Sequence, residues 1–122
     1  MLGSCSSHMR DFWQSLDALV ESSRLIIDRP RGSSHPRYPD LVYPLDYGYL
    51  EGTSAVDGDG VDVWRGSAPE SGLDALICTA DLAGRDAEIK LLIGCSADEK
   101  QVVLDFHNQG LMAGILVERA DG

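Results

Sequence analysis

Residues 29–49 constrain the fold more than any other part of the sequence. They contain four of the five prolines of the chain. Each proline fixes φ and lacks the N–H group that a helix or an inner strand uses. We therefore expect extended chain with short strands here, and no long helix. The whole chain has 122 residues, which is the length of one compact domain.

Outside this segment, the apolar pattern predicts two helices and several short strands. Apolar side chains recur at helical spacing in residues 11–22, and Ser96-Ala-Asp-Glu99 has the pattern of a capping box that opens a helix to about Asn108. The predicted strands are 25–27, 61–64, 73–80, 87–93 and 111–118, with a turn at Gly84-Arg85. We expect residues 1–10 to be a flexible N-terminal lead and residues 11–122 to form a single domain.

This order of elements predicts an α+β fold. Many short strands between an N-terminal helix and a late helix favour a small antiparallel sheet, either closed or strongly curved, of the OB-like β-barrel type. A domain of this size can bury a core without disulfides or a structural metal. Any bound metal is therefore expected to serve chemistry.

The charge balance limits the classes of partner. The chain has 20 acidic and 10 basic side chains, for a formal net charge of −10, so it should repel nucleic acids and anionic membranes. No apolar run approaches the roughly 20 residues of a membrane span. The odd number of cysteines (Cys5, Cys78 and Cys95) follows no zinc or redox spacing, which indicates a reducing, cytoplasmic compartment.

The densest chemical signal is Asp57-Gly-Asp-Gly-Val-Asp62. Three carboxylates in six residues repel one another unless they are solvated or bridged by a cation. Glycines allow such a loop to turn its carboxylates toward one point, and hard oxygen ligands suit Mg²⁺, Mn²⁺ or Ca²⁺. An EF-hand fails on register, because from Asp57 the sixth residue is Asp62 where glycine is needed. A solvated acidic turn remains the alternative.

Two further groups of charged residues accompany this loop. Asp81 and Asp86 flank a Leu-Ala-Gly-Arg turn, so both can face one cavity. The segment 29–49 carries three arginines that could neutralise an anionic substrate in so acidic a protein, namely Arg29, Arg31 and Arg37. Ordinary surface turns and a solvated basic loop are the alternative interpretations.

Together these motifs resemble soluble family I inorganic pyrophosphatases. Tyr43-Pro-Leu-Asp-Tyr-Gly-Tyr49, followed by Asp57-Gly-Asp-Gly-Val-Asp-Val63, is similar to the Tyr-Pro-x-x-Tyr-Gly-Tyr and Asp-Gly-Asp-Pro-x-Asp segments of that family, at the same spacing. Ala80 to Ala87 is similar to the second acidic segment of the family. The resemblance covers residues 27–91, about half of the chain. Gly60 stands where the family has proline, and the late Tyr-Lys pair of the family has no counterpart after Gln101.

The resemblance implies a role for each matched residue. Asp59 would help to generate the attacking hydroxide, and Tyr47 would bind a phosphate oxygen or an adjacent ligand. Asp28 would replace a glutamate of the family. Glu88 takes the position of a phosphate-binding lysine, and Lys90, two residues on along a strand, would face the same side. The implied Mg²⁺ ligands, with Mn²⁺ as the other candidate metal, are Asp57, Asp62, Asp81 and Asp86.

The expected function is therefore Mg²⁺-dependent hydrolysis of pyrophosphate or a related small phosphoanhydride. Two or more metal ions, about 3.5–4 Å apart, would bridge and activate a water molecule. Arg29, Arg31, Arg37 and Lys90 would neutralise the phosphate oxygens. The alternatives are a catalytically impaired module that binds a metal and a phosphate ligand, and a plain interaction domain. Homo-oligomer formation is a further property that the resemblance implies.

Overall fold

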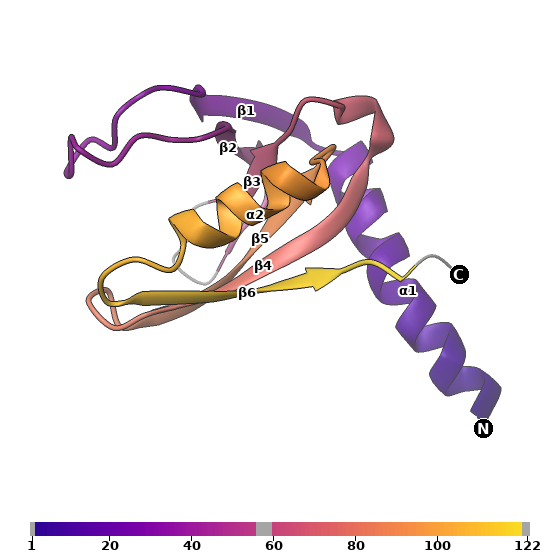
Figure 1. The fold of residues 1–122 in the computed structure, drawn as a ribbon. Helices are drawn as coiled ribbons and strands as arrows, with labels where there is room; N and C mark the ends of the chain where they lie inside the picture. The colour runs from indigo at the N-terminus through magenta and orange to yellow at the C-terminus, as the bar shows by residue number, and fades with distance from the viewer. Residues whose placement is uncertain (1, 56–59, 121–122) are drawn as a thin grey trace.

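The computed structural model describes residues 2–55 and 60–120, with side chains from residue 12 onward. It is an α+β structure, as expected from the sequence, with a six-stranded sheet and two α-helices (Figure 1). In chain order the elements are α1 (Leu2–Glu21), β1 (Arg24–Arg29), β2 (Asp46–Glu51), β3 (Val61–Arg65), the short 3₁₀ turn η1 (Pro69–Ser71), β4 (Leu73–Asp81), β5 (Asp86–Ile93), α2 (Ala97–Phe106) and β6 (Met112–Glu118).

The sheet is open and mixed. Its strand order is β1-β2-β3-β5-β4-β6, and every neighbouring pair is antiparallel except β3 and β5, which are parallel. Within the described chain, β1 and β6 are the two edges and do not pair with each other. The expected closed antiparallel barrel is therefore not confirmed. Helices pack against both faces of the sheet, so both faces are buried without closure.

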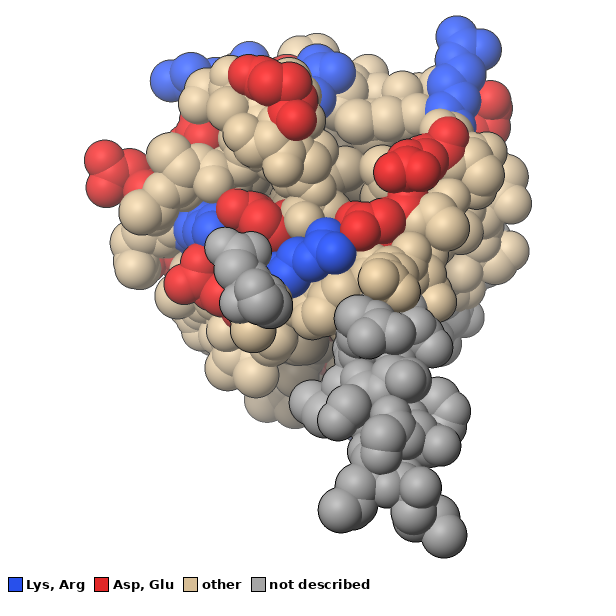
Figure 2. Space-filling view, turned by 90° about the vertical axis from the view of Figure 1, so that its right-hand side faces the viewer, with Lys and Arg blue, Asp and Glu red and all other residues tan. Residues whose placement is uncertain are grey.

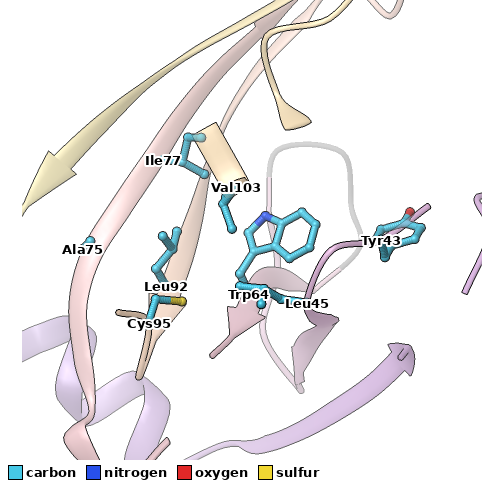
Figure 3. Packing of buried hydrophobic residues seen from close by; sticks show 8 residues of the cluster. All are labelled: Tyr43, Leu45, Trp64, Ala75, Ile77, Leu92, Cys95 and Val103. Carbon is cyan, nitrogen blue, oxygen red and sulfur yellow. The ribbon is translucent and has the colours of Figure 1, made fainter. Parts of the chain in front are cut away.

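The alternation of side chains along the strands divides the core into two layers. On one face, Trp64, Ile77 and Leu92 pack with Val103 of α2 in a fully buried cluster (Figure 3). On the other face, a second cluster that includes Leu91 packs against apolar side chains of α1, among them Leu16. Neighbouring strand residues point to opposite faces, so Leu91 and Leu92 belong to different layers.

Most element boundaries agree with the expectations from sequence. The capping box is present, because the Ser96 N–H donates to Glu99 Oε1 (2.8 Å) and the Glu99 N–H donates to Ser96 Oγ (3.2 Å). Residues 29–49 contain only strand ends and an isolated bridge between Ser34 and Val42. The first helix differs, since it begins at Leu2, nine residues before the predicted start.

Arg119 and Lys100 form ion pairs with residues that are distant in sequence. Arg119, after β6, donates two hydrogen bonds of 2.8 Å to the Asp17 carboxylate of α1, and its guanidinium lies 5.5 Å from the centre of the Trp13 ring. Lys100 of α2 bridges Asp74 and Glu118. Figure 2 shows acidic and basic side chains intermixed on one face of the molecule. In the described part of the chain, no helix is long and apolar enough to cross a bilayer.

Candidate functional site

Strand pairing places the central site residues on one face of the sheet. Tyr47 on β2 pairs with Trp64 on β3, and Val63 pairs with Leu91 on β5. Because side chains alternate, Tyr47, Asp62 and Lys90 all point to the face that α2 covers. Three segments that are distant in sequence therefore meet at one point.

These three side chains form a connected hydrogen-bond network. The Lys90 ammonium donates to Asp62 Oδ2 (2.8 Å) and to the Tyr47 hydroxyl (2.9 Å), and this hydroxyl donates to the same Asp62 oxygen (2.7 Å). Glu88 Oε1 lies 3.5 Å from the ammonium. The positive charge of Lys90 thus balances the negative charges of the two nearest carboxylates, Asp62 and Glu88.

Burial strengthens the electrostatic interactions within this network. Lys90 is only 5% exposed, and a buried ammonium is costly unless it is paired. Burial, followed by the charge of Asp62, raises the pKa of Tyr47 far above its ordinary value. Tyr47 therefore stays protonated and keeps its hydroxyl hydrogen for Asp62 or for a ligand oxygen.

A pocket of about 430 Å³ opens beside the network. Its lining includes Asp28, Arg29, Tyr49 and Asp62, so a carboxylate and a guanidinium face one space. Gly48 also lines this pocket, where β1 and β2 approach closely: a Cβ atom on it would clash with the Ile26 carbonyl. We refer to this space as the Asp62 pocket.

The second acidic pair lies at the tip of the β4–β5 hairpin. Asp81 and Asp86 are paired across the two strands, and both line one shallow pocket. A Cβ atom placed on Gly84 would lie 3.0 Å from Asp81 Oδ2 and 2.8 Å from Asp86 Oδ2. The two carboxylates therefore face the same point over a residue that has no side chain.

This acidic pair is separated from the Lys90 network along the strand. Asp86 and Lys90 are four residues apart on β5, which corresponds to about 13 Å at the usual rise of a strand. Among the described side chains, those of residues 12–55 and 60–120, no group of three or more His, Cys, Asp or Glu that could hold a metal ion is present. Asp57 and Asp59, two of the residues predicted for the metal centre, lie outside the described residues.

The predicted basic residues occupy different positions. Arg29 lines the Asp62 pocket, whereas Arg37 lines a separate pocket with His35 and Asp81. Arg31 is exposed, and its backbone N–H donates to Asp46 Oδ1 (2.9 Å). Arg29 and Asp62 thus line one pocket, and Arg37 and Asp81 line another.

His107, at the C-terminal end of α2, was not among the site residues predicted from the sequence. Its Nε2 accepts a hydrogen bond from Trp64 Nε1 (3.0 Å), so the ring hydrogen resides on Nδ1, which lies 3.2 Å from Met112 Sδ. Burial, followed by the charge of Lys90, lowers the pKa of His107 to about 3. A buried, neutral histidine thus supports Trp64, and only its place beside Phe106 on the late helix could have indicated this.

Asp46 also has a role that was not predicted. It accepts the Arg31 N–H on one oxygen and Arg65 Nη2 (2.9 Å) on the other. The backbone hydrogen bond, followed by the one from Arg65, holds the pKa of Asp46 below its ordinary value. This carboxylate fixes the loop that follows β1, and its place within the Tyr43–Tyr49 motif was the available signal.

Searches with this sequence and structure against protein-family models, curated proteins and solved structures found no match. The resemblance to family I pyrophosphatases thus remains a prediction from the motifs. The geometry of the described residues is the independent basis for a functional proposal.

Proposed function

We propose that this protein is a metal-dependent hydrolase of pyrophosphate or a related small phosphoanhydride. One observation carries the proposal: Tyr47 and Asp62 line one pocket together with Arg29, and both accept a hydrogen bond from the buried Lys90 ammonium. An ammonium, a guanidinium and a phenol hydroxyl are the donors that phosphate oxygens accept from. A carboxylate among them would be a suitable oxygen ligand for a metal ion that neutralises phosphate charge.

The described carboxylates fit a hard cation in part. Asp81 and Asp86 converge on one point over Gly84 at the hairpin tip, whereas Asp62 lines the separate Asp62 pocket. In this proposal the hairpin-tip pair and Asp62, with Asp57, would hold Mg²⁺ or Mn²⁺ at separate positions. The metal would supply charge neutralisation and lower the pKa of a bound water.

The remaining groups bind and orient the substrate. Arg29 and Lys90 neutralise phosphate oxygens, and Tyr47, which stays protonated, donates a hydrogen bond. Arg37 lies beside Asp81 and serves a phosphate group that approaches the hairpin tip. Asp59 takes the proton of the attacking water, as the motif implies. Arg31 and Asp28 contribute charge at the edge of the site.

The experiment is a phosphate-release assay with pyrophosphate and nucleotide substrates at several Mg²⁺ concentrations. The native protein should release phosphate in a Mg²⁺-dependent manner, and Asp59→Asn should lower the rate by about 100-fold or more. Release by the native protein that does not exceed that of Asp59→Asn, with every substrate, would overturn the proposal.

A second candidate function is a binding module without turnover. The contact between Lys90 and Asp62 favours it, because an ammonium already compensates the carboxylate that a metal would otherwise need. A module of this kind would bind a phosphate ligand at low metal concentration. Isothermal titration calorimetry separates the two: tight binding of pyrophosphate with no phosphate release supports the module.

A further inference from the structure

A second, larger pocket lies next to the Asp62 pocket, and the proposed reaction uses only Tyr47, Asp81 and Lys90 of its wall. It has a volume of about 740 Å³ and lies between the α2 face of the sheet, the end of α2 and residues 35–41. Figure 1 shows the β1–β2 loop and the α2–β6 connection at the same end of the sheet. Tyr43 and Tyr47 line both pockets, so the two spaces adjoin.

Most of the wall of this pocket is apolar or aromatic. Tyr38, Tyr43 and Phe106 contribute rings, and Leu41 and Leu111 contribute aliphatic side chains. The Tyr43 and His35 rings are parallel to within 3°, with their centres 6.1 Å apart. Pyrophosphate has no apolar atoms and gains nothing from such walls, whereas a planar organic group does.

The charged groups of the pocket lie apart from one another. Lys90 lies at the inner wall, where it contacts Tyr47 and Asp62. Asp81 belongs to the hairpin tip, about 13 Å from Lys90 along the strand, and Asp40 also lines the pocket. A bare anion would meet two carboxylates here, but an anion with a bound divalent cation would be attracted to them.

His35 contributes little charge to this pocket. Burial, followed by the charges of Arg29 and Arg37, lowers the pKa of His35. Its ring is therefore neutral near pH 7, and it presents an aromatic face beside Tyr38, with ring centres 5.2 Å apart. The entrance thus combines aromatic surface with nearby arginines.

We propose that the substrate is an organic diphosphate of the nucleoside diphosphate type, whose phosphates reach Lys90 and Asp62 while its planar ring occupies the aromatic pocket. This inference rests on the proposed function and names its substrate class. A pocket of this volume suits a ligand of that size. The distance between Lys90 and the hairpin tip matches an extended molecule better than a compact inorganic ion.

The test measures binding by calorimetry with two analogues that cannot be hydrolysed, both in the presence of Mg²⁺. One is α,β-methylene-ADP, and the other is methylenediphosphonate, which lacks the organic group. The native protein should bind the nucleoside analogue about tenfold more tightly or better. Because neither ligand turns over, the result does not depend on whether the protein is a hydrolase.

Three variants complete the experiment. Leu111→Trp should block the pocket and remove the preference, and Tyr38→Ala should weaken it through loss of ring contact; both positions are exposed, at 61% and 57%. Ile115→Trp is the matched control, since Ile115 on β6 is also exposed, at 64%, and lines none of the pockets described above. This control should keep the native preference.

Equal affinity of the native protein for the two analogues would overturn the inference. Retention of the full preference by both Leu111→Trp and Tyr38→Ala would overturn it as well. Either result leaves the hydrolysis of pyrophosphate to be decided by phosphate release. Conversely, a preference for the nucleoside analogue without any phosphate release would support the pocket and contradict only the hydrolase proposal.

Discussion

Lys90 is the residue on which the site depends most directly. Its ammonium is buried, and it contacts Asp62, Tyr47 and, at a longer distance, Glu88. The lysine thus compensates two carboxylates that would otherwise repel each other across β3 and β5. The phosphate-binding role that we propose for Lys90 involves the same ammonium.

Replacement of this lysine should destabilise the protein. Lys90→Gln leaves the Asp62 carboxylate without its cation, and we expect a loss of about 2 kcal/mol in the free energy of unfolding, because the pair is largely buried. Urea denaturation measures this. Arg65→Gln is the control: its pair with Asp46 is 37% and 31% exposed, so its loss should stay below about 1 kcal/mol.

A double variant checks that the effect comes from the pair itself. Lys90→Gln combined with Asp62→Asn removes both charges, so the combined loss should fall below the sum of the two single losses by about 1 kcal/mol. Strict additivity would show that Lys90 and Asp62 do not interact.

The lowered pKa of His107 predicts that the free energy of unfolding depends on pH. In the folded state its pKa is about 3, whereas its ordinary value is 6.5. The unfolded chain therefore binds the extra proton between these two pH values, and stability falls as the pH decreases through 6.5, by up to about 1.4 kcal/mol per pH unit. Protonation would also remove the acceptor of the Trp64 N–H.

His107→Gln tests this, because glutamine offers an acceptor oxygen and does not titrate. Urea unfolding of the native protein and the variant at pH 7 and at pH 5 should show a smaller acid loss in the variant. The same loss in both proteins would mean that another group causes the dependence.

At the scale of elements, α2 is the helix whose start the sequence specifies most clearly. Ser96 and Glu99 cap its first turn, and Glu99 also accepts hydrogen bonds from the N–H and hydroxyl of Ser67. The backbone N–H of Ser96 is the main cause that lowers the pKa of Glu99. The cap therefore joins the helix to the segment that follows β3.

Removal of the capping hydroxyl should cost a measurable part of the stability. Ser96→Ala should lower the free energy of unfolding by about 1 kcal/mol, because the Glu99 N–H loses its acceptor. Thermal or urea unfolding gives the value. Ser71→Ala, at an exposed position in η1, should change it by less than about 0.5 kcal/mol; a loss equal to that of Ser96→Ala would contradict the capping role.

At the scale of the whole molecule, the sequence predicts local structure better than topology. Strands such as 61–64 and 87–93 were found because apolar runs and their bounding turns are local signals. The parallel pairing of β3 with β5 and the open sheet depend on contacts between distant segments, which no local pattern encodes. The expected barrel, which depends on such contacts, is not confirmed.

In the candidate site, too, some features could be predicted from local patterns and others could not. The motif pointed to Tyr47 and Asp62, and strand alternation pointed to Lys90, so their meeting could be anticipated. The contact of Lys90 with Glu88 follows from the same alternation, since the two residues are two apart on β5. The buried partners of His107 and the aromatic pocket arise from tertiary packing, which brings together residues of separate elements, so local sequence patterns do not specify them.

The central claim is that Asp62 belongs to a Mg²⁺-dependent phosphoanhydride hydrolase. The most direct measurement is the rate of phosphate release from pyrophosphate and from a nucleoside diphosphate at saturating Mg²⁺, in the native protein and in Asp62→Asn. We predict Mg²⁺-dependent release that falls by about 100-fold or more in Asp62→Asn. Asp105→Asn, at a carboxylate on α2 that accepts from Gln101, should leave it unchanged. Equal release from the native protein and Asp62→Asn, or none from either, would contradict the claim.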